Sequence, residues 1–328
     1  MPRPALIVIL LAALIVLSVI SLSAGKIWVP WSAWTSAGHD TRWVIIFELR
    51  LPRTILAIAT GVALGMSGAA LQGYTRNPLA DPGVLGISTM ASLGAVLTLY
   101  LSYFGAMGGA TWLLPVGAMA GAIIGVVTLI MLAGAASSML TFILAGVVLN
   151  MVSGAGVALA LSLAPSPWAV NEIINWLMGS LADRSMEEVR FALPFIAAGC
   201  AFLVVASRAL DALTLGETGA RSLGIRLETT RFLLAVGVGL ATGASVAVTG
   251  VIGFVGLVTP HLMRPLVGAR PGALLIPSAL AGAVVVLVAD IAVRLTPSVT
   301  EVKLGVAMAA LGGPFFLMLL ISERRRLA

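Results

Sequence analysis

Asp290 is the residue of this chain whose setting points most directly to chemistry, because its carboxyl group lies within a long run of apolar residues. An acidic side chain inside such a run is a candidate proton carrier. Arg294 follows four residues later, so on a helix the two side chains share a face and can pair. No second acidic residue lies deep in a neighbouring apolar run to continue a relay, and we therefore interpret the pair as structural. A proton-coupled secondary transporter that uses Asp290 is the alternative.

Residues 65–68, Gly-Met-Ser-Gly, place Ser67 in the pattern of a serine nucleophile, and His261 lies on a later apolar segment. Together they suggest an intramembrane serine protease as the enzyme alternative. Gly-x-Ser-Gly arises easily in glycine-rich helices, however, and His261 directly follows a proline near an expected helix end. His39 lies in a polar loop, and neither histidine has a second ligand at metal spacing. The sequence therefore predicts no catalytic residue and no metal site.

The sequence contains no nucleotide-binding loop. Such a loop ends in Gly-Lys-Ser or Gly-Lys-Thr, and neither Lys26 nor Lys303, the only lysines, has that context. The chain is therefore expected to bind no cofactor, and ATP with its magnesium would be held by a partner ATPase. We expect a transport subunit rather than an enzyme.

The expected solvent for most of the chain is lipid. Of 328 residues, 60% are hydrophobic and 10% charged, the mean hydropathy is +1.10, and 36 glycines allow helices to approach closely. A helix needs about 20 apolar residues to cross a bilayer. We predict an all-α membrane protein with about ten transmembrane helices in a single permease domain, residues 1–328. The segments are 5–24, 54–71, 84–104, 112–133, 139–163, 191–206, 232–249, 251–267, 273–293 and 304–321.

An even number of crossings places both termini on the same side of the membrane. The arginines at 324–326 and those between residues 208 and 231 lie on that side, which the positive-inside rule makes cytoplasmic. The first segment ends in small residues, as a signal peptide does. Its apolar stretch is long for a signal core, so we expect a retained helix.

An internal repeat supports a transporter. Shifting the chain against itself by 178 residues (231 − 53) aligns Arg53 with Arg231 and gives eight identities over residues 53–69. The arginine and the Leu-Ala pair that follows it are not explained by glycine abundance. With the predicted topology the halves, residues 50–164 and 229–321, run in opposite directions, as in many transporters. Two similar glycine-rich helices are the alternative.

Two polar segments are candidates for contact with cargo or partner. The break at 72–83 contains two prolines, and irregular backbone at membrane depth is tolerated only where protein or a hydrated cavity surrounds it. It is expected to line a pathway, unless it is only a helix connection. The predicted cytosolic loop, residues 209–228, sets Leu215, Leu223 and Ile225 among polar residues, which suits short amphipathic helices that press on a partner. A solvated loop is the alternative.

Five motifs occur in order along the chain. They are Leu-Arg-Leu-Pro-Arg-Thr at 49–54, Arg-Asn-Pro-Leu-Ala-Asp-Pro at 76–82 with Leu-Gly-Ile-Ser at 85–88, Leu-Gly-Glu at 215–217 with Ala-Arg-Ser-Leu-Gly at 220–224, Gly-Phe-Val-Gly-Leu-Val at 253–258 with Pro-His at 260–261, and Gly-Gly-Pro-Phe-Phe at 312–316. Together they resemble the FecCD-type permease family of ABC importers for iron chelates and cobalamin. The resemblance covers nearly the whole chain.

The resemblance implies a subunit of the bacterial inner membrane that pairs with a second copy of itself. Two cytosolic ATP-binding subunits and a periplasmic substrate-binding protein would complete the transporter. The implied cargo is a ferric siderophore, haem or cobalamin, moved from the periplasm to the cytoplasm.

The resemblance also implies roles for individual residues. A coupling helix that contacts the ATPase is expected to include Leu215, Gly216, Glu217, Ala220, Arg221, Leu223 and Gly224. The glycines would let the chain turn sharply there. Glutamates of the binding protein are expected to dock on exposed outer-side arginines, Arg50, Arg53 and Arg294. Snorkelling of these arginines to lipid headgroups is the alternative. The cytosolic mouth of the pathway is expected at Asn77, Pro78 and Leu79.

Lys303 departs from the family pattern. The family usually has Glu-Leu-Pro-Val-Gly before the last span, and this chain has Glu-Val-Lys-Leu-Gly at 301–305. Lysine in place of proline removes a rigid helix start and adds a charge near the outer mouth. A shift in the preference for cargo or binding protein is therefore expected.

Overall fold

The computed structural model describes residues 3–25, 29–30, 32, 41–103, 112–134, 138–297 and 301–327, and this part of the chain is helical with no β-strand. Every segment predicted to cross the membrane contains one helix, which confirms the all-α class. These helices are α1 (Arg3–Ser23), α3 (Leu51–Thr75), α4 (Ile87–Tyr103), α5 (Leu113–Ala133), α6 (Met139–Ser162), α8 (Met186–Val205), α11 (Leu227–Thr249), α12 (Val255–Val267), α13 (Pro271–Leu295) and α14 (Leu304–Leu327).

The helices differ in their capacity to cross a membrane alone. Among the described residues, seven are long and apolar enough: α1, α3 with the residues before it, α5, α6, α8, α11 and α13. The apolar stretches of α4 and α14 are shorter. Helix α12 has 13 residues, about 20 Å at 1.5 Å per residue, against a hydrocarbon core of about 30 Å.

The predicted span 251–267 begins four residues before the helix does, since α12 starts at Val255. Gly250 and Phe254 have positive φ angles, 71° and 66°, and the chain between them is not helical. These two residues end α11 and delay α12 until Val255. In the same way, the predicted span 84–104 becomes a 3₁₀ turn, Pro82–Leu85, followed by α4, while Phe104 lies outside the described residues.

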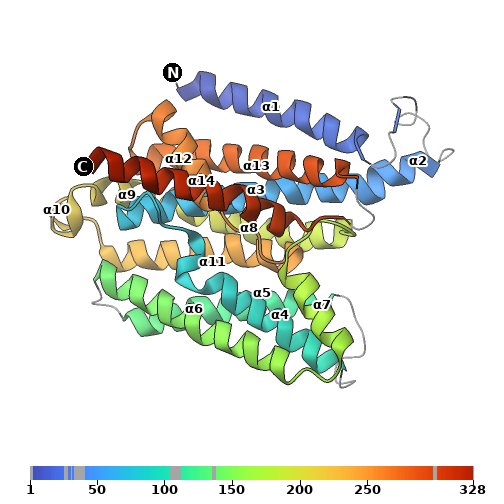
Figure 1. Cartoon of the computed structure of the whole chain (residues 1–328). Coiled ribbons are helices and arrows are strands. Elements are labelled where there is room, and N and C mark those ends of the chain that lie inside the picture. The colour runs from blue at the N-terminus through green and yellow to red at the C-terminus, as the bar shows by residue number, and fades with distance from the viewer. Residues whose placement is uncertain are drawn as a thin grey trace.

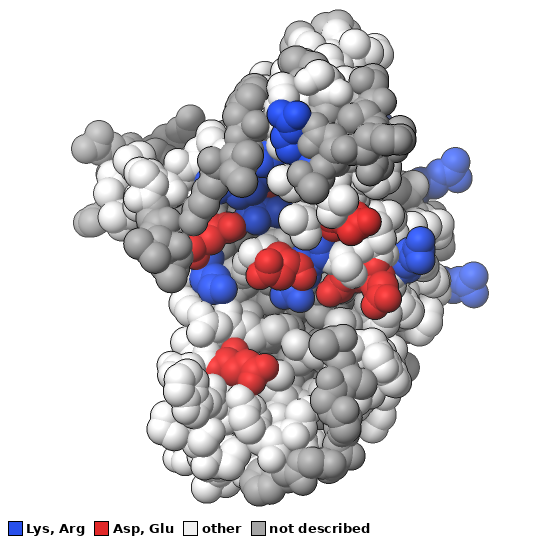
Figure 2. Space-filling view, turned by 90° about the vertical axis from the view of Figure 1, so that its right-hand side faces the viewer, with Lys and Arg blue, Asp and Glu red and all other residues white. Residues whose placement is uncertain are grey.

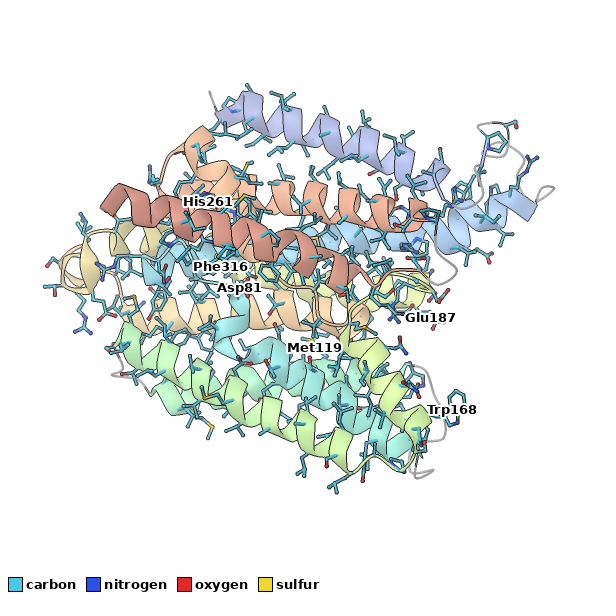
Figure 3. All side chains as sticks on the ribbon, viewed as in Figure 1. Asp81, Met119, Trp168, Glu187, His261 and Phe316 are labelled. Atoms are coloured by element: carbon cyan, nitrogen blue, oxygen red, sulfur yellow. The ribbon has the colours of Figure 1, made fainter. Side chains whose placement is uncertain are left out.

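Four shorter elements lie at the two ends of the bundle (Figure 1). Helix α2 (Thr41–Val44) runs through a π-helical turn, Ile45–Arg50, into α3, and α7 (Pro167–Leu177) lies near the same end. We call this the outer end. Helices α9 (Ser207–Leu213) and α10 (Gly216–Ser222) lie at the opposite, inner end, where both chain termini also lie. Helix α7 was not predicted from the apolar pattern, because it is short and amphipathic; its Trp168 projects from the bundle (Figure 3).

The inverted repeat is visible in the direction of its first helices. Helix α3 starts at the outer end and runs inward, whereas α11 starts at the inner end and runs outward (Figure 1). Each packs along the third helix of the other half: α3 along α13, and α11 along α5. Each is also followed by a break before the next helix. The two halves are therefore interlocked, and the predicted inverted repeat is confirmed.

Small residues allow the central helices to touch backbone to backbone. A Cβ atom placed on Gly61 of α3 would lie 2.5 Å from the backbone nitrogen of Ala283 in α13. Because lipid supplies no hydrophobic force between helices, such close packing and van der Waals contact hold the bundle together. Helix α1 adds to this core by packing along α13, and Ser21 shares a 2.7 Å hydrogen bond with Thr54 of α3.

Candidate functional site

Helix α10 and its flanks present large exposed apolar side chains at the inner end. Leu215 and Leu223, on either side of α10, are 67% and 63% exposed. Gly216 and Gly224 have φ of 85° and 83°, so both predicted sharp turns are confirmed and the helix is set apart from its neighbours. Arg221 also faces outward, whereas Ala220 is fully buried. An apolar side chain on each flank of a short, projecting helix is suited to a groove on a partner protein.

Glu217 points into the protein rather than away from it. Its Oε1 accepts hydrogen bonds from the backbone N–H of Met139, at 3.0 Å, and from Nη2 of Arg231, at 3.2 Å. Arg231 Nε donates to the hydroxyl of Tyr74, at 3.0 Å. The ring of Tyr74 meets that of Phe142 edge-on, with centroids 5.6 Å apart. This inner cluster joins four helices, α3, α6, α10 and α11.

A second charged group, the outer cluster, lies at the opposite end. Asp290 of α13 is completely buried between two guanidinium groups, 2.8 Å from Arg53 Nη2 and 3.0 Å from Arg294 Nη2. Arg53 also donates two hydrogen bonds to Glu301, which precedes α14. The predicted pair of Asp290 with Arg294 is confirmed. Since the carboxylate is the shared partner of two arginines, its structural role has a direct geometric basis.

The expected exposure of the outer-side arginines is wrong. Arg50, Arg53 and Arg294 are only 8%, 8% and 7% exposed. Arg50 donates to the carbonyl oxygens of Leu22 and Ser23 at the end of α1. Arg53 and Arg294 belong to the outer cluster. Arg294 also donates a hydrogen bond to the carbonyl oxygen of Ser21 near the end of α1, at 2.8 Å. The side chains are buried because Asp290, Glu301 and the carbonyl oxygens at the end of α1 accept their hydrogen bonds or pair with them; their docking role stays a prediction.

The break between α3 and α4 turns back into the bundle. Figure 3 places Asp81 about midway between the two ends, so this irregular backbone lies at the depth of the helices around it. Arg76 ends α3 with a left-handed conformation, φ 52°. Asn77 Oδ1 accepts from the N–H of Leu79, at 2.9 Å, and Asp81 Oδ1 accepts from that of Gly83, at 2.8 Å. Asp81 is therefore the N-cap of the 3₁₀ turn that follows.

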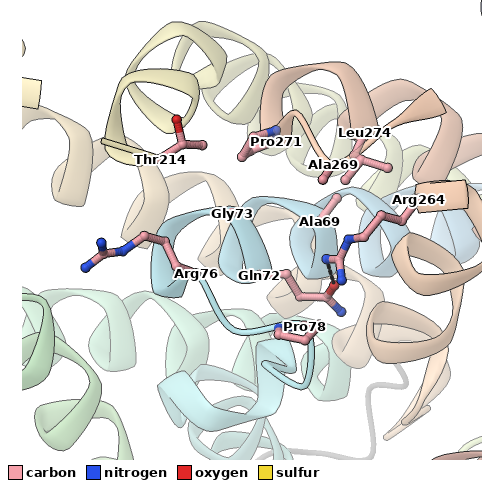
Figure 4. Close-up of a pocket in the computed structure, with 10 residues that line it drawn as sticks. All are labelled: Ala69, Gln72, Gly73, Arg76, Pro78, Thr214, Arg264, Ala269, Pro271 and Leu274. Carbon is pink, nitrogen blue, oxygen red and sulfur yellow. Dashed lines mark hydrogen bonds between the residues drawn. The ribbon is translucent and has the colours of Figure 1, made fainter. Parts of the chain in front are cut away.

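Residues of the predicted cytosolic mouth line two different pockets. Pro78 borders a pocket of about 330 Å³ together with α3, α12 and the start of α13 (Figure 4). Across it, Arg264 Nη2 donates to Gln72 Oε1, at 2.9 Å. Asn77 and Leu79 border a smaller pocket, about 130 Å³, whose far wall is Phe142 of α6. The break thus has open space on two sides, as a segment that lines a pathway requires.

The serine of the Gly-x-Ser-Gly pattern is part of the helix packing. Ser67 is fully buried, and its hydroxyl has no hydrogen-bond partner among the described residues, so no base activates it. The flanking glycines approach the backbone of α13 and α12. His261 packs edge-on against Phe315, with ring centroids 5.8 Å apart, and His39 lies outside the described residues. The geometry gives the protease alternative no support.

Charges of both signs are interspersed over the outer end (Figure 2). Asp183 and Glu187 are exposed near the start of α8, and Glu301 and Lys303 are half-buried before α14. Lys303 therefore stands close to a helix N-terminus, where a positive charge is unfavourable. Within the described residues, no group of three or more His, Cys, Asp or Glu side chains could hold a metal ion.

Sequence reasoning missed three members of the two clusters: Glu301, Tyr74 and the backbone of Met139. Glu301 lies 248 residues from Arg53 along the chain, and Tyr74 lies 157 residues from Arg231. The aligned arginines of the repeat were the available signal. A buried arginine requires a carboxylate or other acceptors, so the sequence predicts that each of these arginines has a partner, but it does not say which one.

Interlocked inverted repeats, helices broken at membrane depth and a projecting helix pair at one end define a polytopic membrane transport protein. The profile of the FecCD transport family matches residues 13–322. The chain belongs to that family.

Relatives agree with this assignment. The chain is 39% identical over 285 residues to the uncharacterized ABC transporter permease protein YvrB of Bacillus subtilis (strain 168), covering 86% of this chain and 80% of the relative. It is 37% identical over 311 residues to the vitamin B12 import system permease protein BtuC of Salmonella typhimurium, covering 94% and 92%.

Solved structures give the same architecture. A metal-chelate type ABC transporter in an inward-facing conformation superposes with a TM-score of 0.85 at 29% identity, covering 97% of this chain and 99% of the other. PsaBC from Streptococcus pneumoniae, solved with a Fab, superposes with a TM-score of 0.52 at 16% identity, over 84% and 92%, and shares the fold alone.

Proposed function

We propose that this chain is the membrane-spanning permease subunit of an ATP-binding-cassette importer that moves a metal chelate or cobalamin from the periplasm to the cytoplasm. The observation that carries the proposal is helix α10, which presents exposed Leu215 and Leu223 at the inner end of a protein whose sequence has no nucleotide-binding loop. Such a helix suits a groove on a cytosolic ATPase. Two ATPase subunits, a second copy of this chain and a periplasmic binding protein complete the proposed transporter.

The proposed orientation follows from α10. If α10 contacts a cytosolic ATPase, then the inner end is cytoplasmic, and both termini are cytoplasmic because they lie at that end. The outer end then faces the periplasm and receives the binding protein. Docking through Arg50, Arg53 and Arg294 would require their present hydrogen bonds to open.

The cargo class rests on similarity. One relative is named for vitamin B12 import and one solved structure for metal-chelate transport. Ferric siderophores, haem and cobalamin are therefore the candidates. The proton-coupled alternative has little support, because Asp290 is held by two arginines in the outer cluster.

The test is reconstitution of this subunit in liposomes with its ATPase and binding protein. Uptake and ATP hydrolysis would be measured with ferric siderophore, haem and cobalamin in separate arms, with and without a proton ionophore. We expect one cargo to stimulate hydrolysis and to enter only when ATP is present, whether or not the ionophore is added. Uptake that ignores ATP and stops with the ionophore would contradict the proposal and support the proton-coupled alternative.

A further inference from the structure

The inner and outer clusters are related by the inverted repeat. Arg53 and Arg231 occupy equivalent positions near the starts of α3 and α11, the first long helices of the two halves. Each arginine is buried and each pairs with a glutamate from a non-helical segment or short helix outside the core: Arg53 with Glu301, and Arg231 with Glu217. The same arrangement thus occurs once at each end of the bundle.

Each glutamate also lies at the start of the last helix of a half. Glu301 comes three residues before Leu304, the first residue of α14. Glu217 is distant in sequence from α6, but its Oε1 accepts the N–H of Met139, the first residue of that helix. The first-turn N–H groups of a helix have no partner within the helix, and the N-terminus favours negative charge. In both clusters, then, the arginine of one half pairs with a glutamate that is connected to the last helix of the other half, through a hydrogen bond for Glu217 and through two intervening residues of the chain for Glu301.

Glu217 lies on the side of α10 that contacts the rest of the chain. Ala220, three residues later and on the same face of α10, is fully buried, and the Glu217 side chain is 27% exposed. Of the exposed side chains, Leu215 and Leu223 lie on the flanks of α10, whereas Arg221, four residues after Glu217, is its neighbour on the helix. The carboxylate of Glu217 already accepts two hydrogen bonds from within the chain.

Helix α6 is suited to move as a unit when its N-terminus is moved. Its outward face is exposed and apolar along its length, with Leu140, Leu144, Met151 and Leu159 all uncovered. Beneath its first turns, Phe142 borders the small pocket beside Asn77 and Leu79. A displacement of Met139 therefore changes the wall of the space next to the predicted cytosolic mouth.

We propose that Glu217 is a positioning residue that transmits movement of α10 to the N-terminus of α6 and to Arg231, rather than a contact with the ATPase. The inference rests on the proposed function, since it assigns the cause of α10 movement to the ATPase. Glu301 holds the equivalent place between Arg53 and α14 at the outer end.

The test compares Glu217→Ala and Glu217→Gln with Glu228→Ala, which removes an exposed carboxylate at the start of α11. Hydrogen exchange of the first-turn amides of α6 would be measured on the permease alone. Loss of a charge-assisted hydrogen bond is expected to speed this exchange about tenfold or more in Glu217→Ala. Glu217→Gln keeps an acceptor and the side-chain volume, so a smaller increase is expected, and Glu228→Ala should match the unmodified protein.

The second arm uses the reconstituted transporter. Glu217→Ala is expected to bind the ATPase with unchanged affinity but to move about tenfold less cargo per ATP. Weaker ATPase binding with unchanged α6 exchange would show that Glu217 is a partner contact and would overturn the inference. Unchanged exchange and unchanged cargo per ATP would overturn it as well. If the unmodified protein shows no ATP-driven uptake, the proposed function fails, whereas the exchange arm still decides whether Glu217 holds α6.

Discussion

Replacement of Asp290 by alanine would leave two buried guanidinium groups, those of Arg53 and Arg294, without the carboxylate that lies between them. The two ion pairs have N–O distances of 2.8 and 3.0 Å, and Asp290 has no exposed surface. Breaking a buried pair from one side costs about 3–5 kcal/mol, because the remaining charge is uncompensated. Arg53 keeps Glu301 as a partner, so we expect the lower end of that range, about 3 kcal/mol of unfolding free energy.

Arg270→Ala is the matched control. Arg270 pairs with Asp211 at 2.7 Å, as close as the buried pairs, but its side chain is 67% exposed. Exposed pairs contribute about 0–1 kcal/mol. Comparing the two variants therefore tests whether burial, and not the N–O distance, determines the free energy lost when the pair is broken. Both would be unfolded in mixed micelles of a mild detergent and SDS, with helical circular dichroism as the signal.

Equal costs for the two variants, each below about 1 kcal/mol, would refute the structural assignment of the outer cluster. Asp290→Asn supplies a second comparison, because it keeps the shape and an acceptor for Arg53 but removes the charge. We expect Asp290→Asn to lose stability and transport together. If it abolished transport and kept full stability, Asp290 would be a proton carrier and the alternative transporter would be supported.

Three further predictions concern packing, capping and coupling. Gly61→Ala should lower the free energy of unfolding by about 1–3 kcal/mol or more through overpacking against α13. Gly154→Ala, in α6 with open space around it, should instead stabilise the protein by about 0.5–1 kcal/mol. The same micelle titration measures both, and equal effects would contradict close packing at Gly61. Asp81→Ala should lower the free energy of unfolding by about 1 kcal/mol, because it removes the acceptor for the N–H of Gly83. Asp81→Asn keeps an acceptor and should retain most of that stability in the same titration. Equal stability of the two variants would show that this hydrogen bond is unimportant. Leu215→Ser should change the free energy of unfolding by less than about 0.5 kcal/mol, since the side chain is exposed. It should nevertheless weaken binding of the ATPase in a pull-down titration. Unchanged binding would argue against α10 as the surface that contacts the ATPase.

The apolar pattern was sufficient to place a helix in each of the ten predicted segments, because a chain in lipid must satisfy its backbone hydrogen bonds within each helix. It did not determine where every helix begins, since α4 and α12 start later than predicted. The pairing of Asp290 with Arg294 could also be predicted, since residues four apart on a helix are neighbours whatever surrounds them. The repeat of Arg53 at Arg231 predicted the opposed directions of α3 and α11. Helix α7 was missed because its length and mixed polarity match neither a span nor a loop.

The exposure of the outer arginines was wrong for a physical reason. Position at a helix end does not determine whether a side chain faces water, since a neighbouring chain segment can cover it. Here the end of α1 supplies carbonyl acceptors to Arg50 and Arg294, and Asp290 supplies a carboxylate. The sequence alone does not reveal that residues 21–24 contact Arg50 and Arg294.

The sequence by itself determined the class of the protein, its helical segments, its repeat and the two exposed leucines beside α10, all of which follow from local composition, periodicity or motif order. Tertiary structure decided the partners of the buried charges. Arg53 pairs with Asp290 and Glu301, which are 237 and 248 residues away along the chain, and Glu217 accepts the N–H of Met139. Those contacts depend on how interlocked halves bring distant helix ends together. No local pattern encodes that meeting, because each charge needs only some partner of opposite sign, and the packing of the small-residue helices selects which one is within reach.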